Sequence, residues 1–301
     1  MYRLRVLQGL IVLSIPLASG LAQGRGDRPE FQGDLITASR PLSYIASSLE
    51  ARYGKPVTYE DPLWREDVDL VPRVGSDLPI PAIRRRTAWL PPELNPVDTP
   101  ILGAAAFTKV LVDFDKRNDG LQYRVEQSSF GLHIIPANLR NADGSSVVSK
   151  NALDAVISIP FAKRTASQHL QVICESAGRQ AGINVTPSAV GFKDDWYERL
   201  FAAPTGQIEW GTEPKTARSA LVDLLEHSAT SFTWRYYCGP SPVPSPSGLP
   251  TCVLNITRIR VAAGDRIKVR VSTGAAASDG AKLDFLEFDR CPACRPGPKR
   301  N

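Results

Sequence analysis

The sequence predicts an α+β protein built from two similar β-α-β-α-β-β units, with the helices packed on one face of small mixed sheets. Three observations support this: four helical patterns, a strand-like run after each of them, and the same order of elements in both halves. Each helical pattern has apolar residues at i, i+3, i+4 and i+7, which form one face of an α-helix. The patterns are Leu42, Ile45, Ala46 and Leu49; Phe107, Val110, Leu111 and Phe114; Leu170, Ile173, Cys174 and Ala177; and Ala217, Ala220, Leu221, Leu224 and Leu225.

The first helix has clear start and stop signals. Ser39 is suited to cap it, and Pro41 fits its first turn, where a missing N–H costs nothing. Gly54 ends it in the left-handed conformation that glycine adopts freely. We therefore expect a helix from about 41 to 53, followed by a strand at 56–59.

We place the first unit at residues 31–136. Within it, residues 61–100 form a Pro-rich insertion that we expect to be mostly extended, with an edge strand at 68–71. A second helix is expected over about 104–116. The alternating runs 121–125 and 130–135 then predict a β-hairpin.

The second unit, residues 153–261, repeats this order after a polar linker at 137–152. Thr165 and Gln168 fit a capping box at the start of its first helix. Gly182 ends that helix 12 residues after the first core leucine, the same spacing as from Leu42 to Gly54 in the first unit. Residues 262–301 are expected to be a strand-containing extension with a mobile tail.

The N-terminus predicts an export signal at residues 1–22. Arg3 and Arg5 precede an apolar segment, and small residues lead to a cleavage site after Ala22. The alternative is an uncleaved N-terminal anchor. We expect a periplasmic or secreted protein with no transmembrane segment in the mature chain.

Composition excludes some functions. Removing residues 1–22 takes away two arginines and no acid, so the net charge falls from +5 to 5 − 2 = +3, which is too small to favour nucleic-acid binding. The three histidines, His133, His169 and His227, lack metal-ligand spacing, and His133 is expected at an outward position of its strand. His227 closes a helix, where positive charge is favourable. No cofactor and no catalytic or metal-ligating residue is predicted.

Five cysteines remain to be explained. Cys238 and Cys252 flank a proline-rich loop between two paired strands, so we expect them to form a disulfide, with two free thiols as the alternative. Cys291 and Cys294 form a C-x-x-C pair that precedes no helix, which favours a structural disulfide over redox catalysis. Cys174 lies on an apolar helix stripe and should be a buried thiol.

Two stretches carry a family resemblance. Residues 35–59, including Pro41, Tyr53 and Gly54, resemble the secretin and TonB short N-terminal domain, and residues 208–234 do so more weakly. This resemblance implies a small periplasmic α+β module that docks other proteins and contributes no catalytic residues. The chain differs from secretins and TonB-dependent receptors because no ring or β-barrel sequence follows the module.

These observations favour an exported, non-catalytic binding or assembly protein whose partner is another envelope protein. An exposed sheet edge would let such a protein add a partner strand. Two alternatives stay open: a secreted hydrolase with a dispersed site, and a thiol–disulfide protein that uses Cys291 and Cys294. The oligomeric state is not predicted.

Overall fold

The computed structural model describes most of the chain from residue 30 to residue 289. The described residues are 30–32, 35–65, 68–72, 81–91, 94, 103–118, 121–141, 143–188, 206–228, 231–239, 248–259, 266–270 and 285–289. The predicted signal with its cleavage site after Ala22 lies outside them, as do Cys291 and Cys294.

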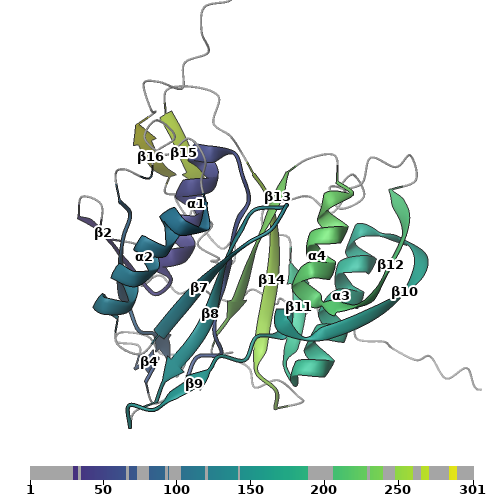
Figure 1. Ribbon diagram of the computed structural model, residues 1–301, viewed down its shortest axis with the longest axis horizontal. Coiled ribbons are helices and arrows are strands. Elements are labelled where there is room, and N and C mark those ends of the chain that lie inside the picture. The colour runs from purple at the N-terminus through teal and green to yellow at the C-terminus, as the bar shows by residue number, and fades with distance from the viewer. Residues whose placement is uncertain are drawn as a thin grey trace, which may run out of the picture.

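The fold is α+β, as the sequence predicted, and each half contains two helices and a set of strands (Figure 1). The first unit comprises β2 (Leu35–Ala38), α1 (Pro41–Tyr53), β3 (Val57–Glu60), β6 (Arg86–Trp89), α2 (Ala104–Arg117), β7 (Leu121–Gln127) and β8 (Leu132–Arg140). The second comprises β10 (Val156–Thr165), α3 (Ala166–Ala181), β11 (Asn184–Ser188), β12 (Gln207–Thr216), α4 (Ala217–Glu226), β13 (Phe232–Cys238) and β14 (Thr251–Arg258). Smaller elements are β1 (Glu30–Gln32), β4 (Leu70–Val71), β5 (Ala82–Ile83), β9 (Ser146–Val148), the 3₁₀-helix η1 (Ala152–Asp154), β15 (Arg266–Arg270) and β16 (Phe285–Asp289).

The strands pair in the same way in both units. The strand before each first helix pairs antiparallel with the strand before the second helix, β2 with β6 and β10 with β12. The strand after each first helix runs parallel to the second strand of the hairpin, β3 beside β8 and β11 beside β14. Internal duplication in the evolutionary sense stays a prediction.

Local signals fixed most helix ends as expected. Gly54 and Gly182 both adopt the left-handed conformation, with φ of 64° and 70°. Thr165 and Gln168 form the predicted capping box at the start of α3. Ser39 is an exception: the N-cap of α1 is Arg40, and the Ser39 hydroxyl donates to the carbonyl of Ile83 instead.

The two units share one sheet, which the sequence did not predict. The strand order is β11-β14-β13-β3-β8-β7, with β9 paired to the far part of β8, and the units meet where β13 runs parallel to β3. Across the sheet, β11, β14 and β13 of the second unit follow one another in the same order as their equivalents β3, β8 and β7 of the first unit. Each strand of the second unit, however, runs in the opposite direction to its equivalent. The second unit is therefore related to the first by a half-turn about an axis that crosses the strands.

This half-turn puts the two helix pairs on opposite faces of the shared sheet (Figure 1). Tyr59 packs in the core of the first unit, whereas its neighbour Glu60 lies opposite Tyr236, which packs in the core of the second. Each unit thus buries its helices on one face of its own strands, as predicted, and the central strands are covered on both faces. No helix among the described residues has the length and apolar character needed to cross a membrane.

Two regions that the sequence marked as irregular contribute strands. β6 lies inside the Pro-rich segment 61–100 and pairs with β2 along its whole length. The linker region 137–152 continues β8, turns at Gly144 with φ of 83°, and returns as β9. The strands β6 and β9 are therefore part of the folded body, because their backbone groups pair with other strands rather than with solvent.

Candidate functional site

Few main-chain contacts join the two units, because β13 and β3 pair over a short length. Only two residue pairs align β13 with β3, Arg235 with Tyr59 and Tyr236 with Glu60, and the N–H of Asp61 donates to the carbonyl of Tyr236. Side chains must therefore supply much of the attachment. Six charged side chains that are nearly or fully buried, arranged as three ion pairs, do so.

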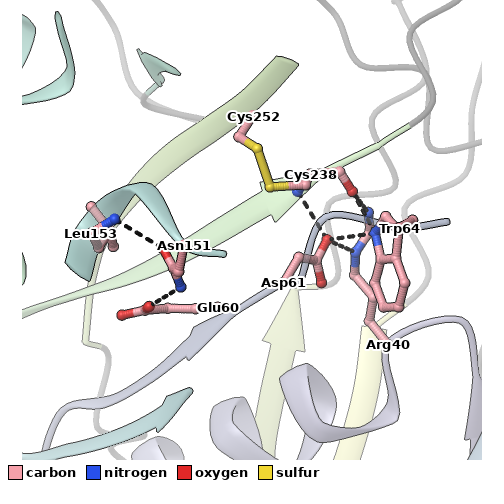
Figure 2. Close-up of a disulfide and its surroundings, with 8 residues drawn as sticks. All are labelled: Arg40, Glu60, Asp61, Trp64, Asn151, Leu153, Cys238 and Cys252. Atoms are coloured by element: carbon pink, nitrogen blue, oxygen red, sulfur yellow. Dashed lines mark hydrogen bonds and ion pairs between the residues drawn. A yellow bond between two sulfur atoms is a disulfide. The ribbon is translucent and has the colours of Figure 1, made fainter. Parts of the chain in front are cut away.

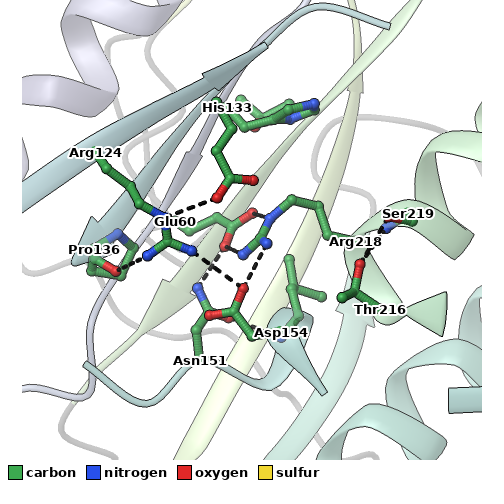
Figure 3. Close-up of polar contacts among 12 residues, drawn as sticks. Glu60, Arg124, His133, Pro136, Asn151, Asp154, Thr216, Arg218 and Ser219 are labelled. Atoms are coloured by element: carbon green, nitrogen blue, oxygen red, sulfur yellow. Dashed lines mark hydrogen bonds and ion pairs between the residues drawn. The ribbon is translucent and has the colours of Figure 1, made fainter. Parts of the chain in front are cut away.

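The first buried ion pair joins α4 to β3 (Figure 3). The Arg218 guanidinium donates twice to the Glu60 carboxylate, at 2.8 and 2.7 Å, and the Glu60 side chain is 0% exposed. Asn151 donates to Glu60 at 2.5 Å, and Arg218 also donates to Asp154 at 2.6 Å. Such a bidentate pair with its remaining lone pairs satisfied is the geometry that makes a buried charge tolerable.

The second ion pair lies on the opposite face of the sheet and joins β13 to α1. Arg235 donates to the two oxygens of Glu50 at 3.2 and 2.7 Å and to the carbonyl of Val57 at 2.9 Å. Glu50 in turn accepts from the N–H of Val57. The two pairs clamp the junction from both faces.

A third cluster holds the main chain of Cys238 (Figure 2). The Asp61 carboxylate accepts from the N–H of Cys238 at 3.0 Å, while Arg40 and Trp64 donate to the carbonyl of Cys238 at 2.9 and 2.6 Å. Arg40 also donates to Asp61 at 2.7 Å. Burial raises the pKa of the Asp61 carboxyl, and the charge of Arg40 opposes that rise.

None of the charged residues in these three clusters was predicted from the sequence to join the units. Their signal was the presence of charges inside otherwise apolar elements, such as Glu50 on the last turns of a core helix and Glu60 at the end of a buried strand. Each charge is paired with an opposite charge and buried, so we assign the cluster a structural role in joining the units; Asp61 Oδ1 is buried without a hydrogen-bond partner among the described residues.

The sheet ends at β7 in the first unit, and β7 has β8 as its only strand partner among the described residues. The N–H of Ser128 donates to Gly131 of the hairpin, and the N–H of Leu132 points away to Pro56. Along an antiparallel strand, the N–H and C=O groups of successive residues point alternately toward the paired strand and away from it. The N–H and C=O groups of Val125 and Gln127 therefore point away from β8, toward the open side of β7.

The opposite end of the sheet is blunted. β11 is the last strand there, and it carries Pro187, which has no N–H to offer. Proline on an edge strand is a common protection against strand addition. Among the described residues the two ends of the sheet thus differ chemically: β11 carries a proline, whereas β7 has outward backbone groups and no strand beside them.

His133 is buried, which corrects the outward position predicted from the alternation. It is 2% exposed and stacks on Trp234 at 5.2 Å, because the second unit covers the face of β8 that a lone first unit would expose to solvent. Its ring bonds Thr58 at 3.0 Å and Ser128 at 2.8 Å. Burial lowers the pKa of His133 to about 4, and the charge of Arg218 adds to this effect.

The Ser128–His133 pair resembles a nucleophile and base only superficially. The Ser128 hydroxyl accepts from the N–H groups of Phe130 and Gly131, so it is engaged in the hairpin turn. The buried imidazole lies between two hydroxyls and two aromatic rings, where it stabilises packing. We assign this group a structural role.

Other residues that the sequence singled out are the five cysteines and His227. Cys238 and Cys252 form the predicted disulfide, and Cys174 is a buried free thiol, whose pKa burial raises. His227 caps α4, with its Nδ1 atom bonded to the carbonyl of Asp223. Whether Cys291 and Cys294 are bonded stays a prediction.

Within the described part of the chain, no group of three or more histidine, cysteine, aspartate or glutamate side chains could hold a metal ion. No protein-family model, no curated protein and no solved structure matches this chain. The resemblance to the secretin and TonB short N-terminal domain therefore stays a prediction that rests on the residues named above.

Proposed function

We propose that this protein is an exported, non-catalytic binding or assembly protein of the cell envelope, and that it docks another envelope protein. The observation that carries the proposal is the asymmetric sheet, closed by proline at β11 and open at β7. A strand edge with free backbone groups binds extended segments of partner proteins through main-chain hydrogen bonds.

The distribution of buried charge supports a binding role. The charged groups with the most elaborate hydrogen bonding, Glu60, Asp61 and Arg235, attach one unit to the other. Because the two units share one sheet and are joined by buried ion pairs, the edge of β7 has a defined place relative to the second unit. The predicted export signal and the Cys238–Cys252 disulfide fit a protein that works outside the cytosol.

The experiment is affinity capture with the full chain from the periplasmic fraction of cells treated with a short-range crosslinker. We expect one envelope protein to be recovered in near-stoichiometric amount and to bind again when both proteins are purified. Recovery of the chain alone under several growth conditions would count against the proposal.

A further inference from the structure

The junction inside the chain shows how an edge of this type accepts a strand. β13 and β7 are equivalent elements, each being the first strand of its hairpin, and β13 receives β3 in parallel. Tyr123 packs on its own helix α2, as Trp234 packs in the core of its own unit, so Arg124 corresponds to Arg235. Within the described part of the chain, the edge of β7 therefore lacks a strand where the equivalent edge of β13 has β3.

Helix α2, which packs beside β7, differs from helix α4 beside β13 in the same way: its equivalent side chains are less covered. When the buried positions of α2 and α4 are aligned, Val112 is the equivalent of Val222 and Thr108 is the equivalent of Arg218. Arg218 is the side chain that reaches across β13 to Glu60. Val222 is 8% exposed, whereas Val112 is 49% exposed. The core that contains Val222 is also covered by residues of the first unit, such as Leu63 and Phe130.

A shallow hollow of about 260 Å³ lies along this side of α2. Its lining residues are Ala105, Thr108, Lys109, Val112, Asp113 and Lys116. Asp113 pairs with Arg117 at 2.7 Å, so the two lysines leave the hollow with a positive character around an apolar centre. An occupant with an apolar side chain flanked by a carboxylate would complement it.

We propose that the edge of β7, together with the Thr108–Val112 stripe of α2, binds an extended segment of a partner protein. The segment runs parallel to β7, places an apolar side chain over Val112 and carries an acidic residue that faces Lys109. The inference rests on the proposed function, because it names the surface and the kind of partner that serve it.

A second copy of this chain fits the surface less well. The strand of a second copy that would enter in parallel, as β3 does beside β13, is β11, where Pro187 stands five residues after the helix-ending glycine, the position of Tyr59 in the first unit. Gly178 likewise stands where Glu50 does, so Arg124 would find no acid equivalent to the one that holds Arg235. A second copy would lose one ladder hydrogen bond and one ion pair.

The test uses linear decapeptides displayed on phage and selected on the full chain. One selected peptide is then synthesised with a fluorescent label, and its affinity is measured by anisotropy. Gln127→Pro removes an outward N–H, whereas the matched control Gln127→Ala keeps it; both variants lose the side-chain bond to the N–H of Ala104. Loss of one main-chain hydrogen bond corresponds to about a 2- to 10-fold weaker affinity.

A second pair of variants tests the helix stripe without touching the strand. Val112→Asp is expected to weaken the peptide at least about fivefold, because it puts a carboxylate at the apolar centre. Val147→Asp alters a valine on β9 that is 48% exposed, close to the 49% of Val112, and should leave affinity unchanged. Both valines are exposed, so neither substitution should prevent folding.

The outcomes separate this inference from the proposed function. Peptides that bind the wild-type chain and lose affinity in Gln127→Pro and Val112→Asp support the inference. Peptides or a captured envelope partner that bind all variants equally overturn it and leave the proposed function standing. Concentration-dependent self-association of the wild-type chain that Gln127→Pro abolishes also overturns it, since the occupant is then a second copy.

Discussion

Removing the cation from the best-defined clamp should destabilise the whole chain. Arg218→Met takes two hydrogen bonds from Glu60, whose side chain is 0% exposed, and leaves the carboxylate with Asn151 as its remaining donor among the described residues. Breaking a buried pair in this way costs about 3–5 kcal/mol of unfolding free energy. The partly exposed contact between Arg218 and Asp154 adds less than about 1 kcal/mol.

The assay is equilibrium unfolding in urea, followed by tryptophan fluorescence and circular dichroism. The double variant Arg218→Met with Glu60→Gln removes the stranded charge, so we expect it to recover about 2 kcal/mol relative to the sum of the single changes. Arg117→Met, which breaks the exposed pair with Asp113, serves as the control and should cost under about 0.5 kcal/mol. A cost below 1 kcal/mol for Arg218→Met, or strict additivity of the two changes, would refute the reasoning.

Two further predictions concern the disulfide and the buried histidine. Replacing Cys238 and Cys252 together by alanine should lower the unfolding free energy by about 3 kcal/mol, because the bond joins residues that are 14 positions apart in the sequence. Urea unfolding measures this, and an unchanged midpoint would contradict it. For His133, the unfolded chain binds a proton near pH 6.5 and the folded chain only near pH 4. Stability should therefore fall by about 3 kcal/mol as the pH drops from 6.5 to 4. His133→Gln should remove this component of the pH profile, and an identical acid slope in both proteins would show that His133 is not its source.

The sequence predicted the parts of the fold that depend on local chemistry. Helix stripes, the glycines at 54 and 182, and the capping box at Thr165 are each determined by residues within about one helical turn or by a single backbone conformation. The Cys238–Cys252 bond was predictable for a related reason, since a hairpin brings the ends of its loop together.

The sequence did not predict how the two units combine. Joining their strands into one sheet depends on contacts between residues 158 and 185 positions apart, as in Arg218 with Glu60 and Arg235 with Glu50. Seen alone, each of these charges is typical of a solvated surface. The misplacement of His133 has the same origin, because alternation within one strand cannot show that a second unit covers its other face.

The candidate surface was predicted only in outline. An open sheet edge was expected, but the difference between β7 and β11 depends on knowing which strands end the sheet. Pro187 can be recognised as blocking a sheet edge only once β11 is known to be the last strand. The exposure of Val112 indicates an uncovered surface only when it is compared with the buried Val222.

Amide hydrogen exchange along β7, followed by NMR in the free chain, tests the central claim most directly. If β7 is an open edge, the amides of Arg124 and Glu126, which point to β8, exchange slowly, and those of Val125 and Gln127 exchange at least about 100-fold faster. Addition of a bound peptide should then protect the two fast amides. Uniformly slow exchange along β7 in the free chain would show that the edge is already covered and would contradict the account.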